Sequence, residues 1–78
     1  MFENLIFTAH ALSRMLERDV TGSQILYVLD KPDAFRSGQP GTTVLSRAFS
    51  DGRVLKVYVA GEFPLDVPTI IVTVVWKG

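Results

Sequence analysis

The sequence of 78 residues has no cysteine, one histidine and no excess of either charge. Without cysteine there is no disulfide framework, thiolate metal site or cysteine nucleophile, and a single histidine makes a zinc site unexpected. Eight basic residues balance eight acidic ones, which argues against a protein that coats nucleic acid through its overall charge. This balance of charge is compatible with an enzyme that binds a few phosphates at one place. We expect neither a metal nor another cofactor.

Long hydrophobic runs are also absent. No apolar stretch approaches the ~20 residues of a membrane span, and the start from Met1 to Asn4 is not that of a signal peptide. We therefore expect a soluble, cytoplasmic protein with no membrane association. Hydrophobic residues make up 47% of the chain, too many for a disordered protein. The length suits a single domain over residues 1–78, and part of the apolar surface is compatible with a homodimer or a partner interface.

Two helices are expected in the first half of the chain. Thr8 is a suitable N-cap for a first helix that ends near Arg18. Thr21 and Gln24 have the spacing of a capping box that opens a second helix, and Pro32 follows its end. The residues expected to face the core are Ala11, Leu12, Met15 and Leu16 in the first helix, and Ile25, Leu26, Val28 and Leu29 in the second.

The second half of the chain has the pattern of β-strands. The Asp51-Gly52 pair is a strong signal for a hairpin with a two-residue loop between strands at 43–50 and 53–60. The β-branched run over 69–76 predicts a further, well-buried strand. Residues 34–36 are ambiguous between a short strand and a loop.

The segment from Gly61 to Pro68 predicts a longer turn. The expected fold is therefore α+β, with two N-terminal helices packed on one face of a small antiparallel β-sheet of three to four strands.

The predicted hairpin decides which side chains share a sheet face. A two-residue loop pairs Arg47 with Lys56, and opposite residues project to the same face. The open face then offers Arg47 and Lys56 to phosphates and Tyr58 to a base, as in a surface that binds a nucleotide strand. A register slip of one residue would reverse these assignments. The expected core face comprises Val44, Ala48, Leu55, Val57, Val59, Ile70, Val72, Val74 and Trp76, and the expected open face comprises Leu45, Arg47, Phe49, Lys56, Tyr58, Thr69, Ile71, Thr73 and Val75.

His10, Arg14 and Arg18 are spaced four residues apart, so they form a line along one side of the first helix. A histidine can exchange a proton near neutral pH, and an arginine can clamp a phosphate. The line therefore indicates phosphodiester chemistry. A structural interpretation is also open, in which His10 bonds a nearby backbone group and the arginines form ion pairs with Glu17 on a solvated face.

The segment from Phe7 to Thr21, FTAHALSRMLERDVT, resembles the opening of a widespread bacterial family of small domains of unknown function. Those domains begin with threonine–x–histidine–alanine, followed by arginine–methionine and a glutamate–arginine pair. They continue with a glycine–arginine hairpin, here Gly52-Arg53, and a last strand that contains a threonine, here Thr73. Such domains are similar to the barnase–EndoU–colicin–RelE group of metal-independent ribonucleases, many of which are toxins.

This resemblance implies a ribonuclease with His10, Arg14, Arg18 and Thr73 as catalytic residues. His10 would act as general base on a ribose 2′-hydroxyl or as general acid on the leaving oxygen. Both arginines would stabilise charge on the cyclising phosphate, and Thr73 would orient it. The candidates for the second proton transfer are Tyr58, Glu17, Lys56 and water.

Two functions from different classes are therefore predicted as alternatives. The first is a toxin-like, metal-independent endoribonuclease that cleaves RNA through a 2′,3′-cyclic phosphate and is neutralised by a cognate antitoxin or immunity protein. The second is a non-catalytic protein-interaction module, antitoxin- or immunity-like or a regulatory subunit. The line of His10 and two arginines favours the enzyme, whereas the neutral charge and the apolar residues on the open face favour the module.

Overall fold

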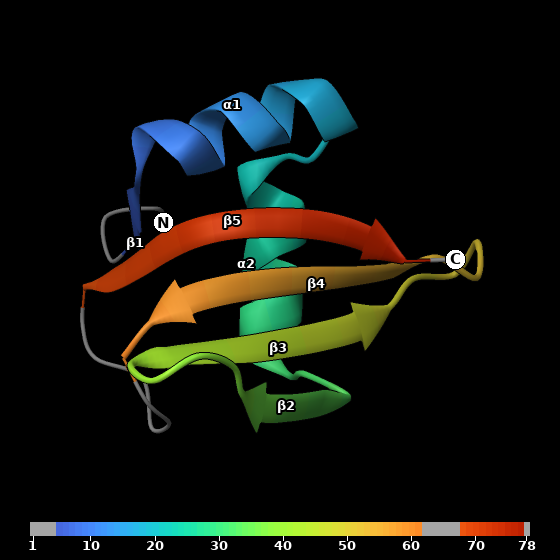
Figure 1. Cartoon of the computed structure of the whole chain (residues 1–78). Helices are drawn as coiled ribbons and strands as arrows, with labels where there is room; N and C mark the ends of the chain where they lie inside the picture. The colour runs from blue at the N-terminus through green and yellow to red at the C-terminus, as the bar shows by residue number, and fades with distance from the viewer. Residues whose placement is uncertain (1–4, 62–67, 78) are drawn as a thin grey trace.

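The described part of the protein consists of a five-stranded sheet and two helices (Figure 1). The computed structural model describes residues 5–61 and 68–77. Along the sheet the strand order is β1-β5-β4-β3-β2, with β1 parallel to β5 and the other neighbours antiparallel. The elements are β1 (Leu5–Phe7), α1 (Ala9–Arg18), α2 (Gly22–Asp30), β2 (Ala34–Ser37), β3 (Thr42–Ala48), β4 (Val54–Ala60) and β5 (Thr69–Lys77).

The α+β class is confirmed, but the sheet has five strands where three to four were expected. The ambiguous segment at 34–36 is strand β2. The unexpected strand is β1, which has three residues and pairs with β5 across a wide sequence separation. Most of the longer turn expected from Gly61 to Pro68 lies outside the described residues.

Both helices begin at the predicted caps. The hydroxyl of Thr8 accepts a hydrogen bond from the backbone N–H of Ala11 at 3.0 Å. Thr21 and Gln24 form the complete capping box, with side chain to backbone distances of 2.8 and 3.2 Å. These bonds satisfy amide groups that have no partner within the helix. Local sequence therefore fixes where each helix starts.

One face of the sheet is covered by α2, which lies behind β3 and β4 in Figure 1. Strand β4 alternates as a half-covered strand should, with Leu55, Val57 and Val59 fully buried and Lys56 and Tyr58 partly exposed. We call the side that α2 covers the helix face and the other side the open face. The buried core comprises Ala11, Val20, Ile25, Val28, Leu45, Leu55, Val57, Val59, Ile71 and Val74.

The expected core stripe of α1 is wrong for two of its four residues. Ala11 is fully buried and Met15 packs against the core, but Leu12 is 49% and Leu16 86% exposed. The reason is that α1 lies along β5 and contacts the sheet through a narrow line. The line consists of Ala11, Met15 and Arg18. These residues are four and three positions apart, so they lie on one side of the helix.

The hairpin between β3 and β4 has a three-residue loop, not the predicted two-residue loop. Phe49 and Arg53 are joined by a backbone hydrogen bond of 2.8 Å, and the Gly52 N–H donates to the Phe49 carbonyl at 3.0 Å. Gly52 has a φ of 90°, the left-handed conformation that such loops place at their last residue. The carboxylate of Asp51 accepts from the backbone N–H and from the guanidinium of Arg53, and these two bonds lower the pKa of Asp51.

This extra loop residue shifts the register of β3 by one and exchanges its faces. Lys56 lies opposite Ser46, and Arg47 lies opposite Leu55. Arg47 therefore projects to the helix face, against the prediction. The exchange affects the whole strand: Leu45 and Arg47 lie on the helix face and Phe49 packs against the core, whereas Val44, Ser46 and Ala48 lie on the open face.

A β-bulge changes the faces of β5 partway along the strand. Tyr58 lies opposite Thr73, but the next residue, Val59, lies opposite Ile71. The bulge adds one residue to β5, so Ile71 is buried on the helix face, although Ile70 and Val72 were predicted there. Beyond the bulge the predicted faces are correct: Val74 and Trp76 lie on the helix face, and Thr73 and Val75 lie on the open face.

Leu55 and Lys56 provide a direct test of these faces, since they are neighbours on β4 that project to opposite sides. Leu55→Ala should lower the free energy of unfolding by about 2–5 kcal/mol because it leaves a cavity in the core. Lys56→Ala should change it by no more than about 0.5 kcal/mol. Urea unfolding of both variants measures the difference, and similar losses in the two would contradict the assignment.

Candidate active site at the open face

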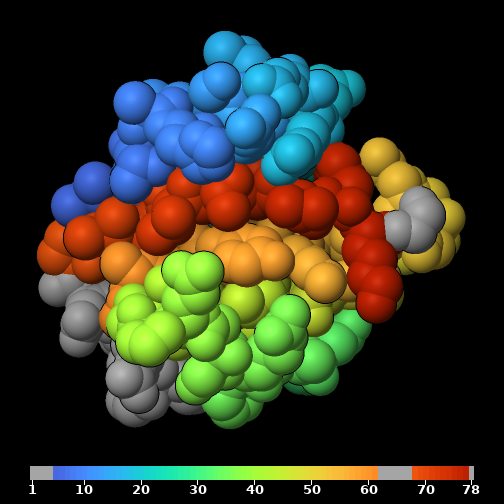
Figure 2. Space-filling view, in the orientation of Figure 1, coloured from blue at the N-terminus to red at the C-terminus, as the bar shows by residue number. Residues whose placement is uncertain are grey.

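The open face is a hollow surface bordered by α1. Figure 2 shows the strands β4 and β5 recessed between α1 on one side and the green segment that includes β2 and its connection to β3 on the other. The register places Thr73 beside Tyr58, Tyr58 beside Val44, and Val44 beside Arg36, in one row across the sheet. A second row contains Val75, Lys56 and Ser46.

The open face is positively charged although the chain as a whole is neutral. The five strands contain no aspartate or glutamate. Their basic residues are Arg36, Arg47, Lys56 and Lys77, and the pairing places Arg36, Lys56 and Lys77 on the open face. With no carboxylate among them, these side chains attract anions to this side of the sheet.

Two side chains of the first helical segment hold α1 against the free edge of β5. Strand β1 pairs with β5 only as far as Ile71. Beyond that point the Thr8 hydroxyl donates to the Val72 carbonyl at 3.2 Å, and Arg18 Nη1 donates to the Val74 carbonyl at 2.7 Å. In return Trp76 Nε1 donates to the Arg18 carbonyl at 2.7 Å. These bonds also show that α1 and β5 run in the same direction.

His10 and Arg14 lie on the flank of α1 that is directed to the open face. Viewed down the helix axis, His10 lies about 100° and Arg14 about 60° from Ala11 in one direction of rotation. Leu12 lies about 100° from Ala11 in the opposite direction. The helix is right-handed, runs along β5 and turns Ala11 to the sheet, while α2 lies behind (Figure 1). His10 and Arg14 therefore border the open face, whereas Leu12 points away from it.

The two residues differ in their partners. His10 is exposed and makes no hydrogen bond with any other described residue, so the backbone bond of the structural interpretation is not found among these residues. Arg14 forms an exposed ion pair with Glu17, at 2.8 and 3.0 Å. Such a pair contributes little stability, and Arg14 can exchange Glu17 for another anion at small cost.

Among the described acidic groups, Glu17 lies on α1 beside Arg14, and Asp33 and Asp51 lie in loops with partners of their own. Asp33 accepts from the Ala48 N–H at 2.8 Å, and Asp51 is bound to Arg53. Within residues 5–61 and 68–77, no three or more His, Cys, Asp or Glu come together as a metal-binding group would require. Over the same residues, neither helix has the length and apolar character needed to cross a membrane.

One family model matches almost the whole chain. It is described as a domain of unknown function, DUF4258, and the match covers residues 7–76. The chain belongs to this family. The matched region of this DUF4258 member runs from Phe7 in β1 to Trp76 in β5, so it contains both His10 and Thr73. No curated protein and no solved structure matches the chain.

Six of the seven predicted site residues of this DUF4258 domain lie on the open face, at its border or at the edge of β5. His10 and Arg14 border the open face, and Thr73, Lys56 and Tyr58 lie on it. Arg18 contacts the edge of β5. Its side chain therefore has a partner within the fold.

Arg47 is misplaced in the sequence-based site. On the helix face its guanidinium donates to the Tyr27 carbonyl at 2.8 Å and lies 3.7 Å from the centre of the Tyr27 ring. The open face has Arg36 and Ser46 in its place, which the sequence analysis missed because β2 was ambiguous and the β3 register was shifted. The alternation of β2 against β3 would have identified both residues once the three-residue loop was known.

Arg14 and Arg18 allow a matched test of the edge contact, since they are one helical turn apart. Arg18→Ala should lower the free energy of unfolding by about 1.5–3 kcal/mol because it removes a charged hydrogen bond and leaves the Val74 carbonyl without it. Arg14→Ala should cost less than about 1 kcal/mol. Thermal or urea unfolding measures both, and equal losses would contradict the edge-binding role.

Proposed function

We propose that this protein is a metal-independent endoribonuclease that cleaves RNA through a 2′,3′-cyclic phosphate. The observation that carries the proposal is the position of the chain's one histidine. His10 borders a hollow, positively charged sheet face on which Thr73 and Tyr58, two residues with hydroxyl groups, are cross-strand neighbours. A proton carrier, cations and hydroxyl donors beside an accessible surface are the groups that phosphodiester cleavage needs.

The open face supports the binding of a single strand of RNA. Lys56 offers a cation to the phosphates, and Tyr58 offers an aromatic ring on which a base can stack. The strands carry no carboxylate, so the strands themselves offer no acidic group that would repel the RNA backbone. A local patch of this kind binds RNA without the strong overall basic charge of a nucleic-acid-coating protein.

In the proposed reaction, His10 accepts the proton of a ribose 2′-hydroxyl. The 2′-oxygen then forms a bond to the adjacent phosphorus, and the bond from phosphorus to the 5′-oxygen breaks. That leaving oxygen takes a proton from Tyr58 or from water, which completes the proton balance. Arg14 leaves Glu17 to neutralise the phosphate oxygens, and Thr73 donates a hydrogen bond that orients them.

Arg18 takes a positioning role in this proposal. Its guanidinium is held by the Val74 carbonyl, which keeps α1 on β5 and His10 at the border of the open face. An effect of Arg18 on the reaction then acts through the placement of His10.

A cytoplasmic toxin of this type requires a neutralising partner. We propose a cognate antitoxin or immunity protein that contacts α1 on the flank away from the open face, where Leu12 and Leu16 are 49% and 86% exposed. Exposed leucines on one helix flank suit an apolar partner surface. A second copy of the chain would offer the same exposed leucines to this flank, as in a homodimer.

These exposed leucines also favour the second candidate function, a non-catalytic interaction module such as an antitoxin-like or regulatory subunit. In that case α1 would serve as a docking element, and the charge of the open face would have no catalytic use. The two functions differ in one outcome, because only the ribonuclease cuts RNA.

The test compares wild-type protein with His10→Ala on a labelled mixed-sequence RNA in excess chelator. Wild type should release fragments that end in 2′,3′-cyclic phosphate, and His10→Ala should be about 10²–10⁴-fold slower because it lacks the proton acceptor. Ser13→Ala, an exposed residue of the same helix, is the control and should cut at the wild-type rate. Intact RNA with folded wild-type protein would favour the interaction module instead.

A further inference from the structure

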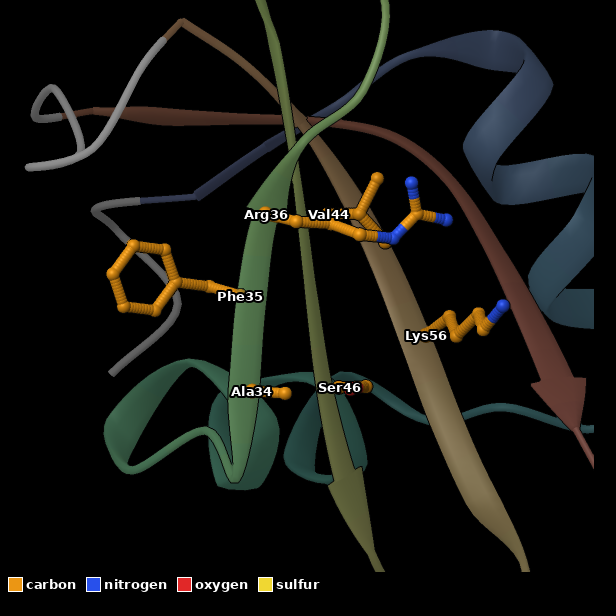
Figure 3. A pocket seen from close by; sticks show the side chains of 6 residues that line it. All are labelled: Ala34, Phe35, Arg36, Val44, Ser46 and Lys56. Carbon is orange, nitrogen blue, oxygen red and sulfur yellow. The ribbon is translucent and has the colours of Figure 1, made fainter.

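A small pocket lies on the open face at the side of the sheet away from α1. It has a volume of about 70 Å³ and is lined by Ala34, Phe35, Arg36, Val44, Ser46 and Lys56. Figure 3 shows the Arg36 side chain reaching across β3 toward β4, and the Lys56 side chain extending from β4 on the same side. The volume exceeds the ~10–15 Å³ that one water molecule requires, so it admits a larger polar group.

Among the described residues, Arg36 differs from the other four arginines in having no partner. Neither Arg36 nor Lys56 makes a hydrogen bond or an ion pair with another described residue. Two positive side chains on one sheet face repel one another unless an anion lies between them. The arginines that do have partners are Arg14 with Glu17, Arg18 with Val74, Arg47 with Tyr27 and Arg53 with Asp51.

We propose that this pocket binds a phosphate of the RNA strand, separate from the phosphate that is cleaved. Arg36 and Lys56 supply the opposite charge, and the Ser46 hydroxyl, which lines the same pocket, supplies a neutral donor. The inference rests on the proposed function, since it assigns the pocket to the same substrate. It extends that function by specifying a second phosphate and the path of the strand.

The rows of the sheet define that path. Thr73, Tyr58, Val44 and Arg36 are successive cross-strand neighbours from β5 to β2. The pocket is lined by residues of β2, β3 and β4 and by none of β5 or α1, so a phosphate bound there is not the one at Thr73 and His10. The RNA therefore crosses the strands, with its cleaved phosphate at Thr73, a base on Tyr58 and a further phosphate at Arg36. The substrate is an oligonucleotide rather than a dinucleotide.

Binding of a fluorescein-labelled 2′-O-methyl hexanucleotide, which cannot be cleaved, tests the pocket without relying on activity. The double variant Arg36→Gln with Lys56→Gln should weaken binding about tenfold or more relative to wild type. The control is Lys31→Gln with Arg53→Gln, which removes the same charge away from the open face and should change binding less than threefold. Equal weakening by the two double variants would overturn the inference, because it would reflect net charge alone.

A parallel titration with inorganic phosphate locates the site. In NMR spectra of the wild-type protein, saturable shifts are expected at the amides of Ser46 and Lys56, and the Arg36→Gln with Lys56→Gln variant should lose them. Shifts elsewhere, or none, would overturn the inference. Cleavage is measured separately. If this variant loses hexanucleotide binding and the wild type leaves RNA intact, the phosphate pocket is supported and the ribonuclease is rejected.

Discussion

The free edge of β5 is the constraint on which the arrangement of this protein depends. Strand β1 ends too early to pair with all of β5, and the carbonyls of Val72 and Val74 are instead bound by Thr8 and Arg18. An unsatisfied strand edge would invite pairing with another chain. By covering it with a helix, the fold also fixes α1 beside the open face, with His10 at its border. The same contacts therefore cover the edge of β5 and place His10 beside the open face.

The open face is positively charged because its strands contain no acidic residues. The described acidic residues occur on helices and in loops, and the strands have none. A chain with zero net charge therefore carries a positive surface on one side. Arg47 lies on the helix face, where it stacks on Tyr27, so the charge on the open face comes from Arg36, Lys56 and Lys77. In the proposed function, this positive face meets the phosphate backbone of the RNA.

Local patterns predicted the local structure well. The caps at Thr8 and Thr21 and the alternation of β4 are confirmed, because neighbouring residues determine them. The face of Arg47 was wrong because one additional loop residue shifts a whole strand, and the bulge in β5 has no local sequence signal. For the candidate site, His10, Thr73 and Lys56 could be named from the sequence. Arg36 could not, since its strand is recognised only through its pairing with β3.

The central claim is that RNA binds on the open face and not on the helix-covered side. An NMR map of the amides that shift when the uncleavable hexanucleotide is added to ¹⁵N-labelled protein tests it most directly. The account predicts shifts that run from His10 through Thr73 and Lys56 to Arg36. Shifts that centre on α2, around Tyr27 and the buried side of β3, would contradict it.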